Sequence, residues 1–121
     1  MINVSVEATL VELAQKIKAN PEPIRGFFAV YHFVLGGEES GTYEIKFGND
    51  EATYRLGGTE QAGCTLELSD ENFIKLVQGT LNPAAALVTG KLKIKGDMGL
   101  SLKLQTLLYS YQTSSLRAGN E

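Results

Sequence analysis

The chain has few of the residues that build disulfides, metal sites or membrane spans. A single cysteine, Cys64, excludes an internal disulfide and fits a reducing compartment. No apolar run approaches the roughly 18 residues that a membrane-spanning helix needs. The N-terminus also lacks the basic start and apolar stretch of a secretory signal. These absences predict a cytoplasmic protein.

Catalytic and metal-binding residues are equally sparse. The single histidine, His32, has no His or Cys partner at metal-ligand spacing, and nothing places it beside a nucleophile. We expect a core or cavity histidine with a satisfied hydrogen bond. Cys64 alternates with Leu66 and Leu68 and is expected to be a small buried hydrophobe. We therefore predict no catalytic residue, no metal, no cofactor and no enzymatic activity.

Negative charge dominates, but it is unevenly distributed. The net charge of -3 argues against nucleic acid as a partner. Residues 38–71 carry nine acids and two bases, whereas residues 91–103 carry four lysines and one aspartate. The lysines have three possible roles: an ordinary solvated face, protection of a sheet edge, or transient contact with anionic membrane headgroups or a lipid's acidic head.

The hydrophobic pattern predicts a single α+β domain over residues 1–121, with a flexible tail at 113–121. The expected order is helix, four strands, two helices, strand, helix. Strands and helices are thus grouped, which predicts a five-stranded mostly antiparallel sheet covered on one face by helices. Gly48-Asn49-Asp50 predicts a tight hairpin turn. The expected helix caps are Ser5, Ser69, Gly79 and Asn82, and the expected strands are 27–35, 42–47, 51–56, 64–68 and 91–95.

The most informative stretch is Gly90 to Leu108, GKLKIKGDMGLSLKLQTLL. Lys91 to Lys95 alternates polar and apolar residues, which predicts a strand. Gly96 to Gly99 interrupts it, with Asp97 as a turn or cap residue. Helical spacing follows, and the apolar residues cover more of that helix than one sheet-facing stripe needs; they are Met98, Leu100, Leu102, Leu104, Leu107, Leu108 and Tyr111.

This stretch, together with Asn82-Pro83 and the segment from Cys64 to Phe73, resembles the signature of the sterol carrier protein family. The match is close over about residues 64–107. The resemblance implies a non-enzymatic carrier with a hydrophobic tunnel that holds a fatty acid, a fatty acyl-CoA, a sterol or a similar lipid. The chain ends Ala118-Gly119-Asn120-Glu121 and so lacks the C-terminal peroxisomal tripeptide of many eukaryotic members.

By this resemblance, the tunnel lies between the sheet and the helices, with a volume on the order of several hundred Å3. Methionine suits such a site because it adapts to ligands of varied shape. The implied lining from the strands is Phe28, Val30, Tyr43, Ile45, Phe47, Leu66 and Leu68. The implied lining from the helices is Phe73, Leu76, Val77, Leu87, Met98, Leu104, Leu107 and Leu108.

Two features of the N-terminal half bear on ligand and assembly. Arg25 stands just before the first strand, and its guanidinium would suit a ligand carboxylate or phosphate; the alternative is a solvated surface arginine. Phe27, Tyr31 and Phe33 alternate on the face opposite Phe28 and Val30. Either a partner subunit covers these aromatics in a homodimer, or the phase of the strand is shifted.

Three functions are compatible with the sequence. The first is a soluble carrier that binds one apolar lipid. The second is an accessory domain that presents an isoprenoid or acyl lipid to a partner enzyme. The third is a scaffold whose core is filled and which binds no lipid.

Overall fold

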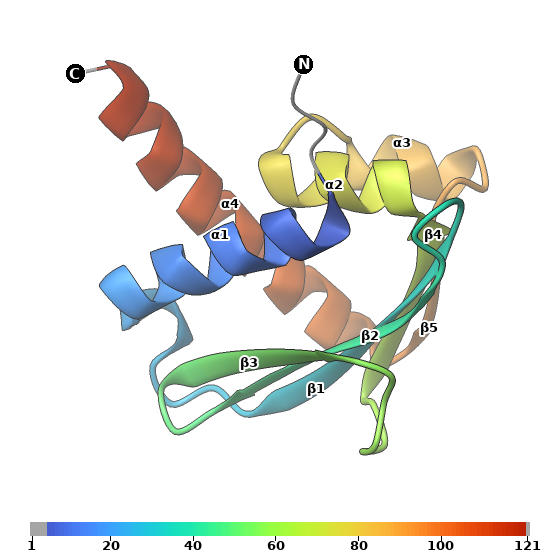
Figure 1. Ribbon diagram of the computed structural model, residues 1–121, viewed down its shortest axis with the longest axis horizontal. Coiled ribbons are helices and arrows are strands. Elements are labelled where there is room, and N and C mark those ends of the chain that lie inside the picture. The colour runs from blue at the N-terminus through green and yellow to red at the C-terminus, as the bar shows by residue number, and fades with distance from the viewer. Residues whose placement is uncertain (1–4, 121) are drawn as a thin grey trace.

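The computed structural model describes the backbone of residues 5–120 and the side chains of residues 5–112. A twisted sheet has the helices packed over one face (Figure 1). The helices are α1 (Val6–Ala19), η1 (Glu22–Ile24, a 3-10 turn), α2 (Asp70–Gln78), α3 (Pro83–Val88) and α4 (Met98–Asn120). The strands are β1 (Ala29–Gly36), β2 (Gly41–Gly48), β3 (Glu51–Leu56), β4 (Cys64–Ser69) and β5 (Lys93–Gly96).

The five strands lie in the order β3-β2-β1-β4-β5. β1 pairs antiparallel with β2, β2 with β3 and β4 with β5, whereas β1 and β4 are parallel. The parallel pair arises because the chain leaves β3 at one edge and returns across the sheet before it enters β4. The predicted α+β class, with a five-stranded mostly antiparallel sheet under helices, is confirmed.

The face of β1 that lies under the helices is the opposite of the one that the resemblance implied for the tunnel lining. Tyr31 and Phe33 are buried under the helices, whereas Phe28 is 68% exposed and Val30 lies on the helix-free face. The register explains this, because Tyr31 lies opposite Ile45 and Cys64, and paired residues share a face. Of the two alternatives, the structure shows the shifted phase: helices cover these aromatics, without need of a partner subunit.

Local turn and cap chemistry places the elements where the sequence predicts them. Asn49 and Asp50 have φ values of 55° and 61°, the left-handed pair that a tight hairpin requires. The side chains of Ser5, Ser69 and Asn82 each accept a backbone N–H at the start of α1, α2 and α3. The predicted hairpin and these three caps are confirmed.

The C-terminal segment departs from expectation at both of its ends. β5 begins at Lys93, so Lys91 precedes the strand. α4 begins beside Asp97, whose Oδ1 accepts from the backbone N–H groups of Gly99 and Leu100 at 2.7 and 3.2 Å. The backbone of α4 stays helical to Asn120, through the region expected to be a tail. Asp97 is therefore a cap, as predicted, and the helix is longer than the sequence indicated.

Candidate functional site

The space between the sheet and the helices is apolar and closed. It contains a void of ≈ 10 Å3 with no polar lining, about the room of one water molecule. Aliphatic and aromatic side chains fill the rest, and the rings of Phe33 and Phe73 meet edge to face, with centroids 5.1 Å apart. The expected tunnel of several hundred Å3 is therefore not open in this structure.

A second apolar void of ≈ 10 Å3 lies between α1 and β3. It shares the side chains of Leu13, Ile17 and Ile45 with the first void. The two voids therefore mark one apolar seam, which runs from α4 past α1 to the edge of the sheet. A long apolar molecule could follow this seam if the surrounding side chains separated.

Most of the implied lining residues do converge on this interior. The first void is bounded by Ile45, Phe47, Phe73, Val77, Leu104, Leu107 and Leu108. Tyr43, Leu66, Leu68 and Leu76 belong to the same buried core. Whether any of these side chains contacts a lipid remains a prediction.

Four of the implied lining residues lie elsewhere. Phe28 and Val30 are on the helix-free face because of the shifted phase of β1. Leu87 is partly exposed on the short helix α3, and Met98, the first residue of α4, is 54% exposed. We therefore do not place these four side chains in the interior.

Sequence reasoning missed four residues that border the main void: Leu13, Ile17, Phe33 and Tyr111. Each carried a usable signal. Leu13 and Ile17 lie on the apolar stripe of the first helix, Tyr111 continues the stripe of the last helix, and Phe33 is in the odd phase of the first strand. Only the choice of strand phase kept Phe33 out of the expected lining.

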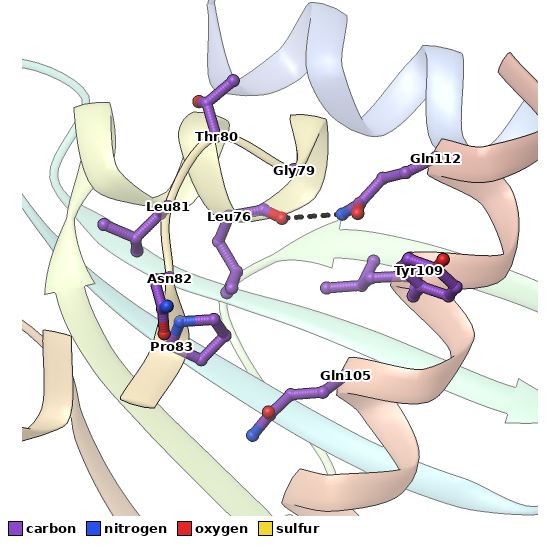
Figure 2. Close-up of a pocket in the computed structure, with 10 residues that line it drawn as sticks. Leu76, Gly79, Thr80, Leu81, Asn82, Pro83, Gln105, Tyr109 and Gln112 are labelled. Atoms are coloured by element: carbon purple, nitrogen blue, oxygen red, sulfur yellow. Dashed lines mark hydrogen bonds between the residues drawn. The ribbon is translucent and has the colours of Figure 1, made fainter. Parts of the chain in front are cut away.

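A solvent-accessible groove adjoins the closed interior. It has a volume of ≈ 460 Å3 and lies between the turn that joins α2 to α3 and the outer side of α4 (Figure 2). Leu108 lines both the groove and the main void, so its side chain forms part of the wall between them. The lining consists of Leu76, Gly79, Thr80, Leu81, Asn82, Pro83, Gln105, Leu108, Tyr109 and Gln112.

Side-chain hydrogen bonds hold α4 against the rest of the fold. Gln112 donates from Nε2 to the carbonyl oxygens of Leu76 and Val77, both at 3.0 Å, at the end of α2 (Figure 2). Tyr111 donates to the carbonyl oxygen of Asn20 at 2.7 Å. Tyr31 donates to that of Leu100 at 2.6 Å. Burial raises the pKa of both tyrosines, so these hydroxyls stay protonated and keep donating at neutral pH.

Arg25 is already engaged by two carboxylates. Its Nε lies 2.6 Å from Glu22 Oε1, and its Nη1 lies 4.0 Å from Asp50 Oδ2. Asp50 also accepts the backbone N–H of Gly26 at 2.8 Å. A ligand anion would have to compete with both acids for this guanidinium, and its role as a head-group residue remains a prediction.

His32 lies on the helix-free face of the sheet rather than in the core. Its Nε2 is 3.0 Å from Oε2 of Glu44, a carboxylate that is only 3% exposed. The same carboxylate oxygen accepts the backbone N–H of Glu60 at 3.1 Å, and Arg55 Nε is 3.9 Å from Oε1. The hydrogen bond with His32 is the main cause that lowers the pKa of Glu44. The predicted satisfied hydrogen bond of His32 is confirmed, and it anchors the crossover loop before β4.

The remaining candidates are a reactive thiol at Cys64, a metal site and a membrane-spanning helix. Cys64 is fully buried, and burial raises the pKa of its thiol, which suits a small hydrophobe. Among the described side chains, no group of three or more His, Cys, Asp or Glu residues converges as a metal site requires. No helix within residues 5–120 combines the length and apolarity needed to cross a bilayer.

Comparison with known proteins identifies the family to which this geometry corresponds. Residues 10–109 match the model of the SCP-2 sterol transfer family. Hydroxysteroid dehydrogenase-like protein 2 of Xenopus laevis is 40% identical over 90 residues, which are 74% of this chain and 22% of that protein. The chain thus spans about a fifth of the length of this curated relative.

Solved structures show the same fold. The sterol carrier protein domain 2 of Helicoverpa armigera superposes with a TM-score of 0.74 at 28% identity, covering 90% of each chain. Palmitated SCP2L2 from Aedes aegypti gives a TM-score of 0.70 at 20% identity, covering 87% of this chain and 95% of that one. The match to the second structure speaks for the fold alone.

Proposed function

Because the chain belongs to the SCP-2 sterol transfer family, we propose that it is a lipid carrier that takes up one fatty acid, fatty acyl-CoA, sterol or similar lipid between its sheet and its helices. The observation that carries this proposal is the apolar seam. Two voids lined mainly by apolar side chains share Leu13, Ile17 and Ile45, and the first of them adjoins the groove at Leu108. An apolar ligand placed along this seam would contact mainly apolar side chains, which favours its transfer from water.

Uptake requires the interior to expand, because the present void holds about one water molecule. The proposed moving part is α4, which is held by the side chains of Tyr31, Tyr111 and Gln112. A neutral hydrogen bond contributes about 1 kcal/mol to stability. Displacement of α4 from its neighbours therefore costs a few such bonds, which burial of a long acyl chain can offset at about 0.8 kcal/mol per CH2 group.

A second role follows from the length of the curated relatives. Hydroxysteroid dehydrogenase-like protein 2 of Xenopus laevis is several times longer than this chain, which matches only 22% of it. The same lipid-binding domain could then present an acyl or isoprenoid lipid to a partner enzyme. We place the chemistry in that partner and propose no reaction for this chain.

Lipid binding can be tested directly on purified protein. We expect native mass spectrometry to detect a co-purified lipid of low mass, and extraction should identify it. Delipidated protein should regain one equivalent when it is titrated with long-chain lipids. If a panel of acids, alcohols, acyl-CoA esters and sterols all fail to bind, the chain is a filled scaffold and the carrier proposal is wrong.

A further inference from the structure

The groove between α2, α3 and α4 has polar walls without charge. None of its ten lining residues, all of which the structure describes, is Lys, Arg, His, Asp or Glu. Its polar side chains are the carboxamides of Asn82, Gln105 and Gln112 and the hydroxyls of Thr80 and Tyr109. An uncharged polar groove at the end of an apolar seam is suited to a lipid head that forms hydrogen bonds but carries no charge.

Asn82 and Gln105 occupy facing walls of this groove (Figure 2). Asn82 accepts the backbone N–H of Ala85 through Oδ1 at 3.2 Å, so its Nδ2 group can donate to a ligand. Gln105 donates from Nε2 to the Ser101 hydroxyl at 3.4 Å, so its Oε1 can accept. A hydroxyl group both donates and accepts, and it matches this pair.

A fatty-acid carboxylate fits the groove less well. The groove offers a carboxylate no cation for a charge-assisted hydrogen bond, and any part of the charge that the groove walls shield from water has no partner, which is costly. Two cations elsewhere in the fold have other neighbours: Arg25 is paired with Glu22, and Lys103 lies 5.3 Å from the centroid of the Phe27 ring. No described residue of the groove supplies the missing charge.

We propose that this groove binds the head group of a neutral lipid, such as a long-chain alcohol, a sterol or a monoacylglycerol, with its apolar body past Leu108 in the seam. The inference rests on the proposed carrier function, and it selects one substrate class. Gln105 and Asn82 bind the head group, and the absence of a cation sets the preference against acids.

The test compares two ligands with the same chain length and different heads. Delipidated wild type is titrated with hexadecanol and with palmitate, each tritiated and below its solubility limit, by equilibrium partition. We expect hexadecanol to bind about tenfold or more tightly. The side-chain amide signals of Asn82 and Gln105 should shift in the NMR spectrum when hexadecanol binds.

A charge-adding variant makes the test sharper. Gln105→Lys places a cation in the groove, and it should raise palmitate affinity about tenfold and so remove most of the preference for hexadecanol. Gln15→Lys makes the same change of charge on the exposed side of α1, and it should leave both affinities unchanged.

Each outcome has one meaning. If wild type binds palmitate as tightly as hexadecanol, or if Gln105→Lys behaves as Gln15→Lys does, the neutral-head inference is overturned while the carrier function stands. If neither ligand binds, and sterol and monopalmitoylglycerol also fail, the proposed function itself is wrong.

Discussion

At the scale of single residues, the helix-free face of the sheet contains the most constrained polar group. Glu44 is buried at 3% exposure and is held by His32, Arg55 and the backbone of Glu60. A buried carboxylate is tolerated only with such partners. Because Glu60 lies in the loop between β3 and β4, these contacts tie that loop to the sheet, and we expect their loss to destabilise the fold.

The pH dependence of stability tests the role of Glu44. Its pKa is lowered on folding, mainly by the hydrogen bond with His32, so its stabilisation is complete above its ordinary pKa of 4.5. This stabilisation is lost as pH falls through the lower folded pKa. We expect the unfolding free energy of Glu44→Gln, measured with urea, to fall less steeply with acid than that of wild type. The exposed Glu51→Gln is the control and should follow wild type; equal slopes for all three proteins would contradict this account.

A glycine next to His32 gives a steric prediction. A Cβ built at Gly58 would lie 2.6 Å from two atoms of the His32 ring, too close to fit. Gly58→Ala should therefore displace the imidazole and cost about 1–3 kcal/mol of unfolding free energy. Gly36→Ala, where nothing lies within 4 Å of the added carbon, should be neutral or slightly stabilising. Equal urea midpoints for the two variants would show that the loop adapts to the methyl group without cost.

At the scale of elements, α4 is the helix on which the proposed uptake depends. It extends past α1 and α2 as one long helix (Figure 1), and Gln112 bonds it to the end of α2. Gly79 makes this contact possible, because a Cβ there would lie 2.7 Å from Gln112 Oε1. Gln112 thus makes a specific hydrogen-bonded contact between α4 and α2 at the rim of the groove.

Loss of the hydrogen bonds between Gln112 and α2 should make lipid exchange faster. Gln112→Ala loses both bonds to the carbonyls of Leu76 and Val77, which should cost about 1–2 kcal/mol of stability. If α4 separates from α2 during uptake, stopped-flow release of bound lipid should become several-fold faster. Thr106→Ala, an exposed position on the same helix, is the control. Identical release rates for the two variants would mean that lipid does not leave between α2 and α4.

The edge strand β5 supports a prediction about aggregation. Its lysines are exposed, and Lys95 pairs with Glu67 of β4 at 2.8 Å. Exposed lysines on an edge strand discourage pairing with another chain. We expect the double variant Lys91→Gln, Lys93→Gln to aggregate faster, by light scattering, with an unchanged rate of lipid transfer. A transfer rate that rises with anionic vesicles and falls with salt in wild type would instead favour membrane docking by these lysines.

At the scale of the whole molecule, packing and ligand binding compete for the same apolar seam. The interior that would hold a lipid is filled by its own side chains, and Leu108 lines both this interior and the groove. Stability without ligand and access for ligand therefore oppose each other. Truncation of Leu108 should change both the stability of the ligand-free protein and the rate of lipid uptake. Truncation of an equally buried residue that does not line the groove should change only the stability.

This contrast can be measured with two truncations. Leu108→Ala and Leu35→Ala each remove a side chain that is at most 5% exposed, and each should cost about 2–5 kcal/mol of unfolding free energy; Leu35 lines neither the groove nor the two voids. Only Leu108→Ala opens the wall between groove and seam, so only this variant should take up lipid several-fold faster than wild type in stopped-flow mixing. Equal acceleration in both variants would mean that general loosening of the core, and not this wall, controls access.

The amino-acid sequence by itself determined the order of elements and their limits where local chemistry is decisive. Ser5, Ser69 and Asn82 cap their helices, and Asn49-Asp50 turns the hairpin, because these effects act within a few residues. The family resemblance from Cys64 to Leu107 likewise depends on motif spacing and agrees with the match over residues 10–109. Most of the interior residues could also be predicted, since periodic apolar positions face a core.

Only the tertiary structure decided the phase of β1, the state of the interior and the groove. The strand from Phe27 to Leu35 is mostly apolar on both faces, so periodicity could not tell whether Tyr31 or Val30 faces the helices. The pairing of Tyr31 with Ile45 and Cys64, which are both buried, places Tyr31 on the helix-covered face. Whether apolar side chains enclose a void depends on how Phe33 and Phe73 fit together, which spacing does not encode. The groove joins Asn82 to Gln105, which become neighbours only when α4 packs beside the turn between α2 and α3.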